Sequence, residues 1–391
     1  MRYLVVPLAA CLLTSSPSRS EVYELPPEGF DVIGAVSTVT ARHEDTLVDI
    51  ARRHGLGYQD IVRANPAVKI WLPGEGTEVV LPTRFVLPPG PREGLVLNLA
   101  EYRMYFYPRP KRGEPSYVYS YPISIGRMDW ETPIGKTKIV AMAENPAWYP
   151  PKSVRDEHAA AGDPLPRIVP PGPNNPLGSR ALRLALPGYL IHGTNRPAGV
   201  GMRVSHGCIR MFPEDIEFLF KHVNVNTVVR IINAPVKIGW DGEALVAEVH
   251  PLLESPQPLV EASLQQIEKL DADIELPDLS EPSKDPLTQV TEQFIAVTAE
   301  RAGQLDWHLV ETLVERSDGI PEAVGVSIKN AATSAAFEYR CRSLTLLIQF
   351  YLDIDFWNIR SMLSRLASQQ ACDSVAADMA RSAVLCAAEA A

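Results

Sequence analysis

The chain has 391 residues, which at about 150 residues per domain predicts two to three folded units. Hydrophobic residues make up 46% and charged residues 21%, which excludes a wholly disordered chain and a multi-span membrane protein. The formal net charge of −10, without any basic run, argues against nucleic acid or an anionic membrane surface as the main partner. The 35 prolines are well above the usual share and favour β-rich units joined by stiff linkers.

The amino terminus is predicted to be a targeting segment. Residues 3–13 are apolar but too short to span a bilayer, and a Ser-rich stretch follows them. This pattern is typical of a secretory signal over residues 1–20, cleaved near residues 18–20. Two alternatives stay open: lipidation at Cys11, which follows Leu-Ala-Ala as in a lipoprotein cleavage box, and an uncleaved anchor. The sequence therefore predicts an exported protein.

Residues 36–83 have the pattern of a small strand–helix–helix–strand unit. In chain order the four elements are expected over 36–42, 46–54, 59–65 and 77–81. Its predicted core consists of aliphatic residues: Leu47, Ile50, Ala51, Ile61, Val62 and Val79. The stretches 45–51, 58–61 and 64–66 resemble the LysM module, which implies binding to the N-acetylglucosamine-containing glycan of cell walls. The alternative is a structural domain that buttresses the next one.

Residues 94–233 are predicted to form a mostly-β domain with one amphipathic helix over 213–222. The strands are expected over 95–99, 104–107, 117–125, 137–142, 181–186, 189–191 and 227–232. Residues 145–176 are rich in Pro, Gly and Asn and show no period, so a long loop is predicted there. A loop of this length in a compact domain is usually functional, for instance as a substrate lid.

The composition changes beyond residue 238. Residues 239–329 are predicted to be an acidic linker and a helical region, with a helical period over 287–314 and a turn over 318–321. Residues 330–391 shift to Ser, Ala, Leu, Arg and Cys and are predicted to be a helical or partly disordered extension without an assigned role. The overall fold class is therefore α+β.

Only one of the five cysteines, Cys208, stands in a context that indicates chemistry. A thiol is a useful nucleophile only as thiolate, so it needs a nearby base or positive field. His206 precedes it by two positions and His192 by sixteen, at the end of a predicted strand. Gly193 and Gly207 permit close backbone approach, and amides around Gly207 and Cys208 are candidates to hold an oxyanion.

Arg210 would lie on the same side as Cys208 if the segment is extended. There it could lower the thiol pKa, hold a substrate carboxylate or pair with a structural acid. A structural zinc site is an alternative reading of the His and Cys residues, but it needs four ligands and the sequence supplies too few nearby. We therefore expect neither a metal nor a cofactor.

The run His192-Gly193-Thr194, followed by Ser205-His206-Gly207-Cys208-Ile209-Arg210, resembles the active-site signature of the L,D-transpeptidases. The resemblance covers about residues 94–233, including 132–135 and 174–178, and implies a β-sandwich catalytic domain of the YkuD type. By this resemblance Cys208 attacks the diaminopimelate carbonyl of a peptidoglycan tetrapeptide stem and expels D-alanine. His192 takes the thiol proton, and the Gly193 carbonyl orients its ring.

The resemblance assigns supporting roles to the residues around the nucleophile, namely Ser205, His206, Gly207 and Arg210. In the long loop, where other members contact substrate, the candidates are Trp148, Tyr149 and Asn174.

Three readings of the function stay open on the sequence. The acyl group could pass to an amine, either a lysine of a Braun-type outer-membrane lipoprotein, typical of the subgroup with a LysM-like unit, or another diaminopimelate. Water as acceptor would instead make the protein an L,D-carboxypeptidase or amidase. A non-catalytic wall-binding scaffold is the third reading. Stem peptides and glycan strands are the expected partners, and a periplasmic location is expected from export together with the family; a Gram-positive wall is the alternative.

Overall fold

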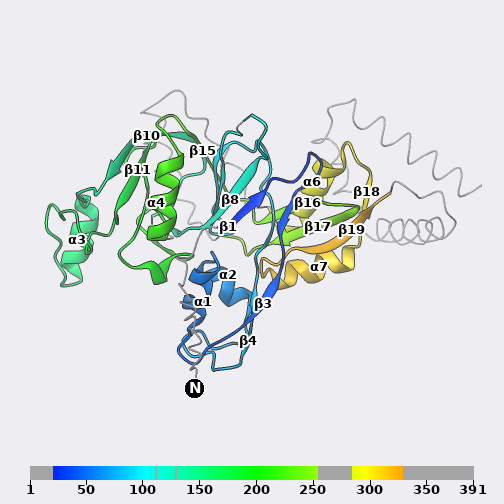
Figure 1. The fold of residues 1–391 in the computed structure, drawn as a ribbon, viewed down its shortest axis with the longest axis horizontal. Coiled ribbons are helices and arrows are strands. Elements are labelled where there is room, and N and C mark those ends of the chain that lie inside the picture. The colour runs from blue at the N-terminus through cyan, green and yellow to red at the C-terminus, as the bar shows by residue number, and fades with distance from the viewer. Residues whose placement is uncertain (1–20, 111, 128–129, 254–283, 329–391) are drawn as a thin grey trace, which may run out of the picture. The chain divides into compact units, whose positions relative to one another are not determined.

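The computed structural model describes residues 21–110, 112–127, 130–253 and 284–328 (Figure 1). The chain divides into two compact units, Met1–Val326 and Ser327–Ala391, and the description below concerns the first. The predictions for the signal over 1–20 and the extension over 330–391 fall outside the described residues, as does most of the acidic stretch. In the described ranges, no helix combines the length and hydropathy needed to cross a bilayer.

The amino-terminal part contains the predicted strand–helix–helix–strand order. The elements are β3 (Ser37–Thr40), α1 (Leu47–Arg53), α2 (Tyr58–Ala64) and β4 (Glu78–Leu81), with β3 antiparallel to β4. Helix α1 begins where a capping box joins Thr46 and Asp49. All predicted core residues are buried except Val62, which is partly buried against them. In the chain, the short strand β2 (Val32–Gly34) precedes this unit and β5 (Arg84–Val86) follows it, and the two strands pair antiparallel.

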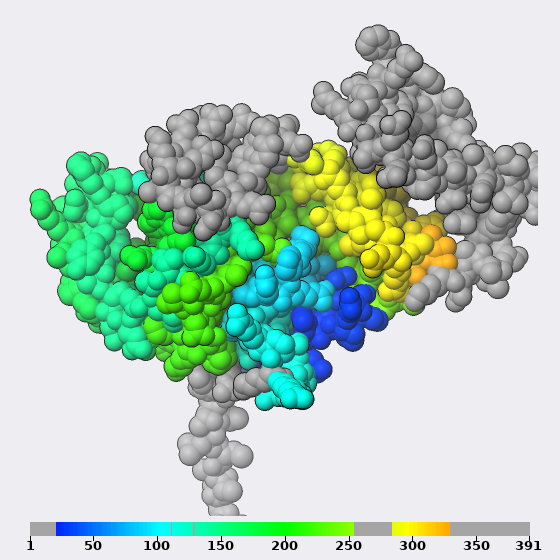
Figure 2. Space-filling model, turned by 90° about the horizontal axis from the view of Figure 1, so that it is seen from above, coloured from blue at the N-terminus to red at the C-terminus, as the bar shows by residue number. Residues whose placement is uncertain are grey.

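A nine-stranded sheet carries the central domain, in the order β1-β8-β7-β6-β15-β10-β11-β12-β14. Its strands are β1 (Glu21–Glu24), β6 (Gly94–Asn98), β7 (Arg103–Tyr107), β8 (Tyr117–Pro122), β10 (Gly135–Glu144), β11 (Arg180–Leu184), β12 (Leu190–His192), β14 (Ile209–Arg210) and β15 (Val228–Ile232). Figure 2 shows the dark-blue amino-terminal residues on the surface against the cyan strands, in keeping with the antiparallel pairing of β1 and β8. The predicted strand over 117–125 is divided into β8 and a separate strand β9 (Ile125–Gly126), which pairs in parallel with β13 (Arg203–Ser205).

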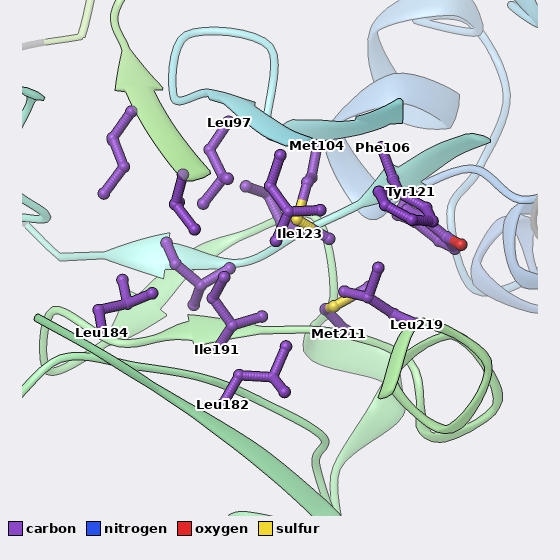
Figure 3. Packing of buried hydrophobic residues seen from close by; sticks show 14 of the residues in the cluster. Leu97, Met104, Phe106, Tyr121, Ile123, Leu182, Leu184, Ile191, Met211 and Leu219 are labelled. Carbon is purple, nitrogen blue, oxygen red and sulfur yellow. The ribbon is translucent and has the colours of Figure 1, made fainter. Parts of the chain in front are cut away.

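Strand β10 pairs with β15 on one side and with β11 on the other, and so joins the two halves of this sheet. Its pairing with β11 is irregular between Ile139 and Ala141. Residues of both halves share one core, in which Leu97, Met104 and Ile123 face Leu182, Leu184 and Ile191 (Figure 3). Helix α4 (Pro213–His222) has the bounds that the sequence predicted and adds Ile216 and Leu219 to the same core. The domain is therefore mostly β with one packed helix, as expected.

The long loop over 145–176 contains a helix that the sequence analysis did not predict, α3 (Lys152–Ala160). Of its nine residues only Val154 is buried, so the segment has no apolar stripe to reveal a helical period. The prediction of an irregular loop is therefore wrong over this range.

The prediction of a linker and a helical region over 239–329 needs a larger correction. Two helices are present, α6 (Pro286–Thr298) and α7 (Trp307–Arg316), but they pack on a four-stranded sheet of order β16-β17-β19-β18. The strands are β16 (Val236–Asp241), β17 (Ala244–Val249), β18 (Gly303–Leu305) and β19 (Glu322–Ser327). Strands β16 and β17 are buried on both faces, so they lack the alternation that marks a half-exposed strand.

Candidate active site

Cys208 lies in a tight turn between the strands β13 and β14. Gly207, directly before it, has φ +91°, a conformation that L side chains rarely adopt. A Cβ at this position would lie 2.8 Å from the Tyr189 ring and 3.3 Å from the Glu131 carbonyl. Glycine is therefore required here, and the turn presents the half-buried Cys208 at the edge of the sheet.

His192 is buried at the end of β12, as the sequence predicted. Its Nδ1 lies 2.6 Å from the Gly193 carbonyl oxygen, which can only accept a hydrogen bond. This contact assigns the proton of the neutral ring to Nδ1 and leaves Nε2 as the basic nitrogen. Burial, reinforced by the nearby charge of Arg210, lowers the pKa of His192 to about 3, so the ring is neutral near neutral pH.

Cys208 and His192 come from neighbouring segments at one edge of the sheet, the turn before β14 and the strand β12. Strand β12 runs parallel to β14, with Ile191 opposite Ile209 and His192 opposite Arg210. Because side chains alternate along a strand, burial of Ile191 and Ile209 in the core places His192, Arg210 and Cys208 toward the other face. The predicted pairing of thiol and imidazole is thus supported by the register of the strands.

The thiol does not contact the imidazole in this structure. Cys208 Sγ donates instead to the Gly188 carbonyl at 3.6 Å, and no hydrogen bond between Cys208 and His192 occurs among the described residues. Burial raises the pKa of the Cys208 thiol, while a backbone hydrogen bond from Leu190 and the Arg210 charge oppose this rise. Both shifts favour a neutral thiol and a neutral imidazole near neutral pH.

Two hydroxyl groups fix the backbone around the nucleophile. Thr132 Oγ1 donates to the Gly207 carbonyl at 2.8 Å, and Ser205 Oγ donates to the Cys208 carbonyl at 2.5 Å. In a planar trans peptide the N–H points away from the carbonyl, so the bond from Thr132 also orients the Cys208 amide. Sequence reasoning noted Thr132 only within the family motif and did not assign it to the site.

Arg210 has an unpaired guanidinium. Within the described parts of the chain it makes neither an ion pair nor a side-chain hydrogen bond, and its Nε is buried without a partner. Burial lowers the pKa of Arg210; the charge of Arg196 lowers it further, and the ionisable Cys208 opposes both. Pairing with a structural acid, one of the three predicted roles, is therefore wrong in the described structure; a cation without a paired acid beside Cys208 has the chemistry to bind a carboxylate.

His206 contacts helix α3, which the sequence did not predict, rather than the sulfur of Cys208. Its Nε2 lies 3.0 Å from Glu157 Oε2, which also accepts from Arg127 at 2.7 Å. The Trp130 ring packs edge-on against the imidazole, with 5.2 Å between the ring centroids. His206 thus joins the turn of Cys208 to the long loop, and Glu157 is a residue that the sequence analysis missed.

The three candidates of the long loop make no hydrogen bond or ring contact with Cys208 or His192 in the described structure. The Trp148 backbone bridges Val169, and Tyr149 is 67% exposed. The carbonyl of Asn174 accepts from Asn195 at 3.1 Å.

The buried amide that organises this loop belongs instead to the next residue, Asn175. Its Nδ2 donates to the Pro146 carbonyl at 2.9 Å, and its Oδ1 accepts from the Leu177 amide.

One group of side chains in the described residues has the composition of a metal site: Glu101, Glu248 and His250. Lys237 Nζ already lies between the two carboxylates, in contact with Glu101 and 2.9 Å from Glu248 Oε1. All four residues are buried. An ammonium group holds the position that a cation would need, so this cluster does not fit a metal ion.

Known proteins match this chain over most of its described length. A family model for the YkuD L,D-transpeptidase catalytic domain matches residues 92–231. The probable L,D-transpeptidase YcfS of Escherichia coli is 39% identical over 253 residues, which are 63% of this chain and 78% of that protein. The probable L,D-transpeptidase ErfK/SrfK of Salmonella typhimurium is 36% identical over 313 residues, which are 79% of this chain and 93% of that protein. The fold, the signature and these relatives together show that the chain belongs to the YkuD family of L,D-transpeptidases.

Proposed function

We propose that the protein is a peptidoglycan L,D-transpeptidase with Cys208 as its nucleophile. The observation that carries this proposal is the parallel register of β12 and β14, which places Cys208 two positions before Arg210, the residue opposite His192, and so on the same face. For the proton to pass to Nε2 of the imidazole, the sulfur has to leave the Gly188 carbonyl. The neutral ring, with Nδ1–H held by the Gly193 carbonyl, is the form that accepts the thiol proton.

The first half-reaction transfers the acyl group to sulfur. His192 takes the proton from Sγ, and the thiolate attacks the carbonyl carbon of the bond between diaminopimelate and the terminal D-alanine. The amide of Cys208, oriented through Thr132, is a donor for the oxyanion that forms. The intermediate then collapses to a thioester while D-alanine leaves with the proton from the imidazolium.

The second half-reaction returns the enzyme to its starting state. His192 takes a proton from the acceptor amine, the nitrogen attacks the thioester carbonyl, and the released thiolate recovers the proton. We propose that the acceptor is an amine, either the lysine of a Braun-type outer-membrane lipoprotein or a second diaminopimelate. Water as acceptor gives the carboxypeptidase alternative.

We propose that residues 36–83 form a LysM-like module that binds the glycan strands of the same polymer. Their strand–helix–helix–strand order supports this assignment. In the loop between α2 and β4, Trp71 and Leu72 are 64% and 65% exposed. A solvated indole ring offers an apolar face on which a sugar ring can stack. We further propose that the protein is exported to the periplasm, with lipidation at Cys11 as the alternative to a cleaved signal.

The experiment that tests the catalytic proposal follows D-alanine release and product mass from a tetrapeptide-bearing muropeptide. The expected result is D-alanine release with a product whose mass shows transfer to the acceptor amine. Tripeptide alone would show hydrolysis, and no turnover would leave the scaffold reading. Cys208→Ala is expected to form no acyl adduct by intact mass; an unchanged rate of D-alanine release in this variant would overturn the mechanism.

A further inference from the structure

The two helices of the amino-terminal module contact the stretch of chain that carries the nucleophile. We call residues 200–214 the nucleophile segment; it includes Ser205, Gly207, Cys208 and Arg210. Within the catalytic domain this segment is held by the short strands β13 and β14, by backbone hydrogen bonds between Ser124 and Arg210, and by the Thr132 hydroxyl. The module adds contacts at both ends of the segment.

The start of the segment is bound to the beginning of α2 through the backbone. The amides of Tyr58 and Gln59 donate to the carbonyls of Val200 and Gly201 at 2.9 and 3.3 Å. Glycine is required at both sides of this contact: a Cβ at Gly57 would lie 2.8 Å from the Gly201 Cα, and one at Gly201 would lie 2.3 Å from the Tyr58 nitrogen. The two backbones therefore meet at a distance that only glycine permits.

The end of the segment is bound to α1 through a side chain. Arg52 donates from Nε and Nη2 to the two carboxylate oxygens of Glu214, each at 2.9 Å. The same guanidinium lies over the Phe212 ring, 5.4 Å from its centroid. A bidentate pair fixes direction as well as distance, so α1 sets the position of the chain just after Arg210.

We propose that the module is a positioning element for Cys208, acting through both ends of the nucleophile segment, in addition to any binding of glycan. The inference rests on the proposed function of Cys208. Since the contacts reach the segment on either side of the nucleophile, loosening them changes the surroundings of the sulfur without removing a catalytic group. The acylation rate with a substrate that carries no sugar therefore depends on the module.

The test compares Arg52→Ala with the matched variant Arg53→Ala in the chain without its predicted signal. Arg53 is the neighbouring residue and also forms a bidentate pair, but with Asp45 inside the module. With a free tetrapeptide as substrate, Arg52→Ala is expected to lower kcat for D-alanine release about tenfold and to change KM less than twofold. Arg53→Ala is expected to leave both within about twofold.

Alkylation of Cys208 by iodoacetamide gives a second readout that does not require turnover. Burial raises the pKa of the Cys208 thiol. A loosened segment is therefore expected to lower the pH at which alkylation of Arg52→Ala is half-maximal, toward the ordinary pKa of cysteine. The alkylation is expected to follow a single kinetic phase. The swapped pair Arg52→Glu with Glu214→Arg is expected to recover the native midpoint and most of kcat.

Two results would overturn the proposal. In one, Arg52→Ala keeps both the native kcat and the native alkylation midpoint; in the other, both variants lose kcat to the same extent. A native chain that releases no D-alanine would contradict the proposed function, and the alkylation arm would then decide the positioning inference by itself.

Discussion

Arg210 and Lys237 are both cations embedded in the protein, yet their surroundings are opposite. Lys237 is fully buried at the start of the carboxyl-terminal sheet and lies between the carboxylates of Glu101 and Glu248. Arg210 is partly buried beside Cys208, and its guanidinium has no acid within reach in the described structure. Removing a charge from water without a partner is costly. The comparison teaches that the paired cation contributes to the fold, whereas the unpaired one has no structural partner and fits the substrate-binding role that we propose for it.

The largest effect, on stability, is expected when the cluster of Lys237, Glu101 and Glu248 loses its cation. Lys237→Met leaves Glu101 and Glu248 buried without their cation, which is expected to lower the free energy of unfolding by about 3–5 kcal/mol. Denaturant unfolding measures this loss. Lys284→Met, which removes an exposed pair with Glu292, is the control and is expected to change stability by less than about 1 kcal/mol. An unchanged stability in Lys237→Met would show that the cluster does not hold the fold.

The next largest effect, on KM, is expected from a substitution of Arg210. Arg210→Gln is expected to raise KM for the tetrapeptide about 10- to 100-fold, because a charge-assisted bond to a substrate carboxylate is lost, without lowering the unfolding midpoint. Since the Arg210 charge lowers the pKa of the Cys208 thiol, the same variant is expected to shift the pH midpoint of Cys208 alkylation upward. Steady-state kinetics and alkylation at several pH values check the two effects. A lowered unfolding midpoint with an unchanged KM would reverse the assignment of roles.

The smallest effect concerns the link between α3 and the turn of Cys208. Glu157→Gln weakens the contacts with His206 and Arg127, and because the Glu157 side chain is partly exposed the change in kcat/KM is expected to be no more than about fivefold. The matched control is Asp156→Asn, which disturbs only an ion pair with Lys152 inside α3. Equal effects of the two variants would show that α3 does not act through His206.

The regular elements were predictable where one face of the chain is buried. Helix α4 has the predicted bounds, because its apolar residues recur with a helical period and Pro213 begins it. Seven of the nine strands of the central sheet lie within a few residues of their predicted ranges, whereas β1 and β14 were not predicted. Strands β16 and β17, which are buried on both faces, were missed, although β6 and β7 are equally buried and were predicted. Helix α3 was missed because almost none of it is buried, so it shows no helical period.

The sequence by itself determined which groups carry the proposed chemistry, because Cys208, His192 and Arg210 lie in short runs whose residue types and glycines indicate that chemistry without knowledge of the fold. Only the tertiary structure decided how these groups are held. Thr132 reaches the Gly207 carbonyl across 75 positions, Glu157 reaches His206 across 49, and Arg52 reaches Glu214 across 162. Contacts of such separation depend on how sheets and helices pack, and no local pattern in the chain encodes them.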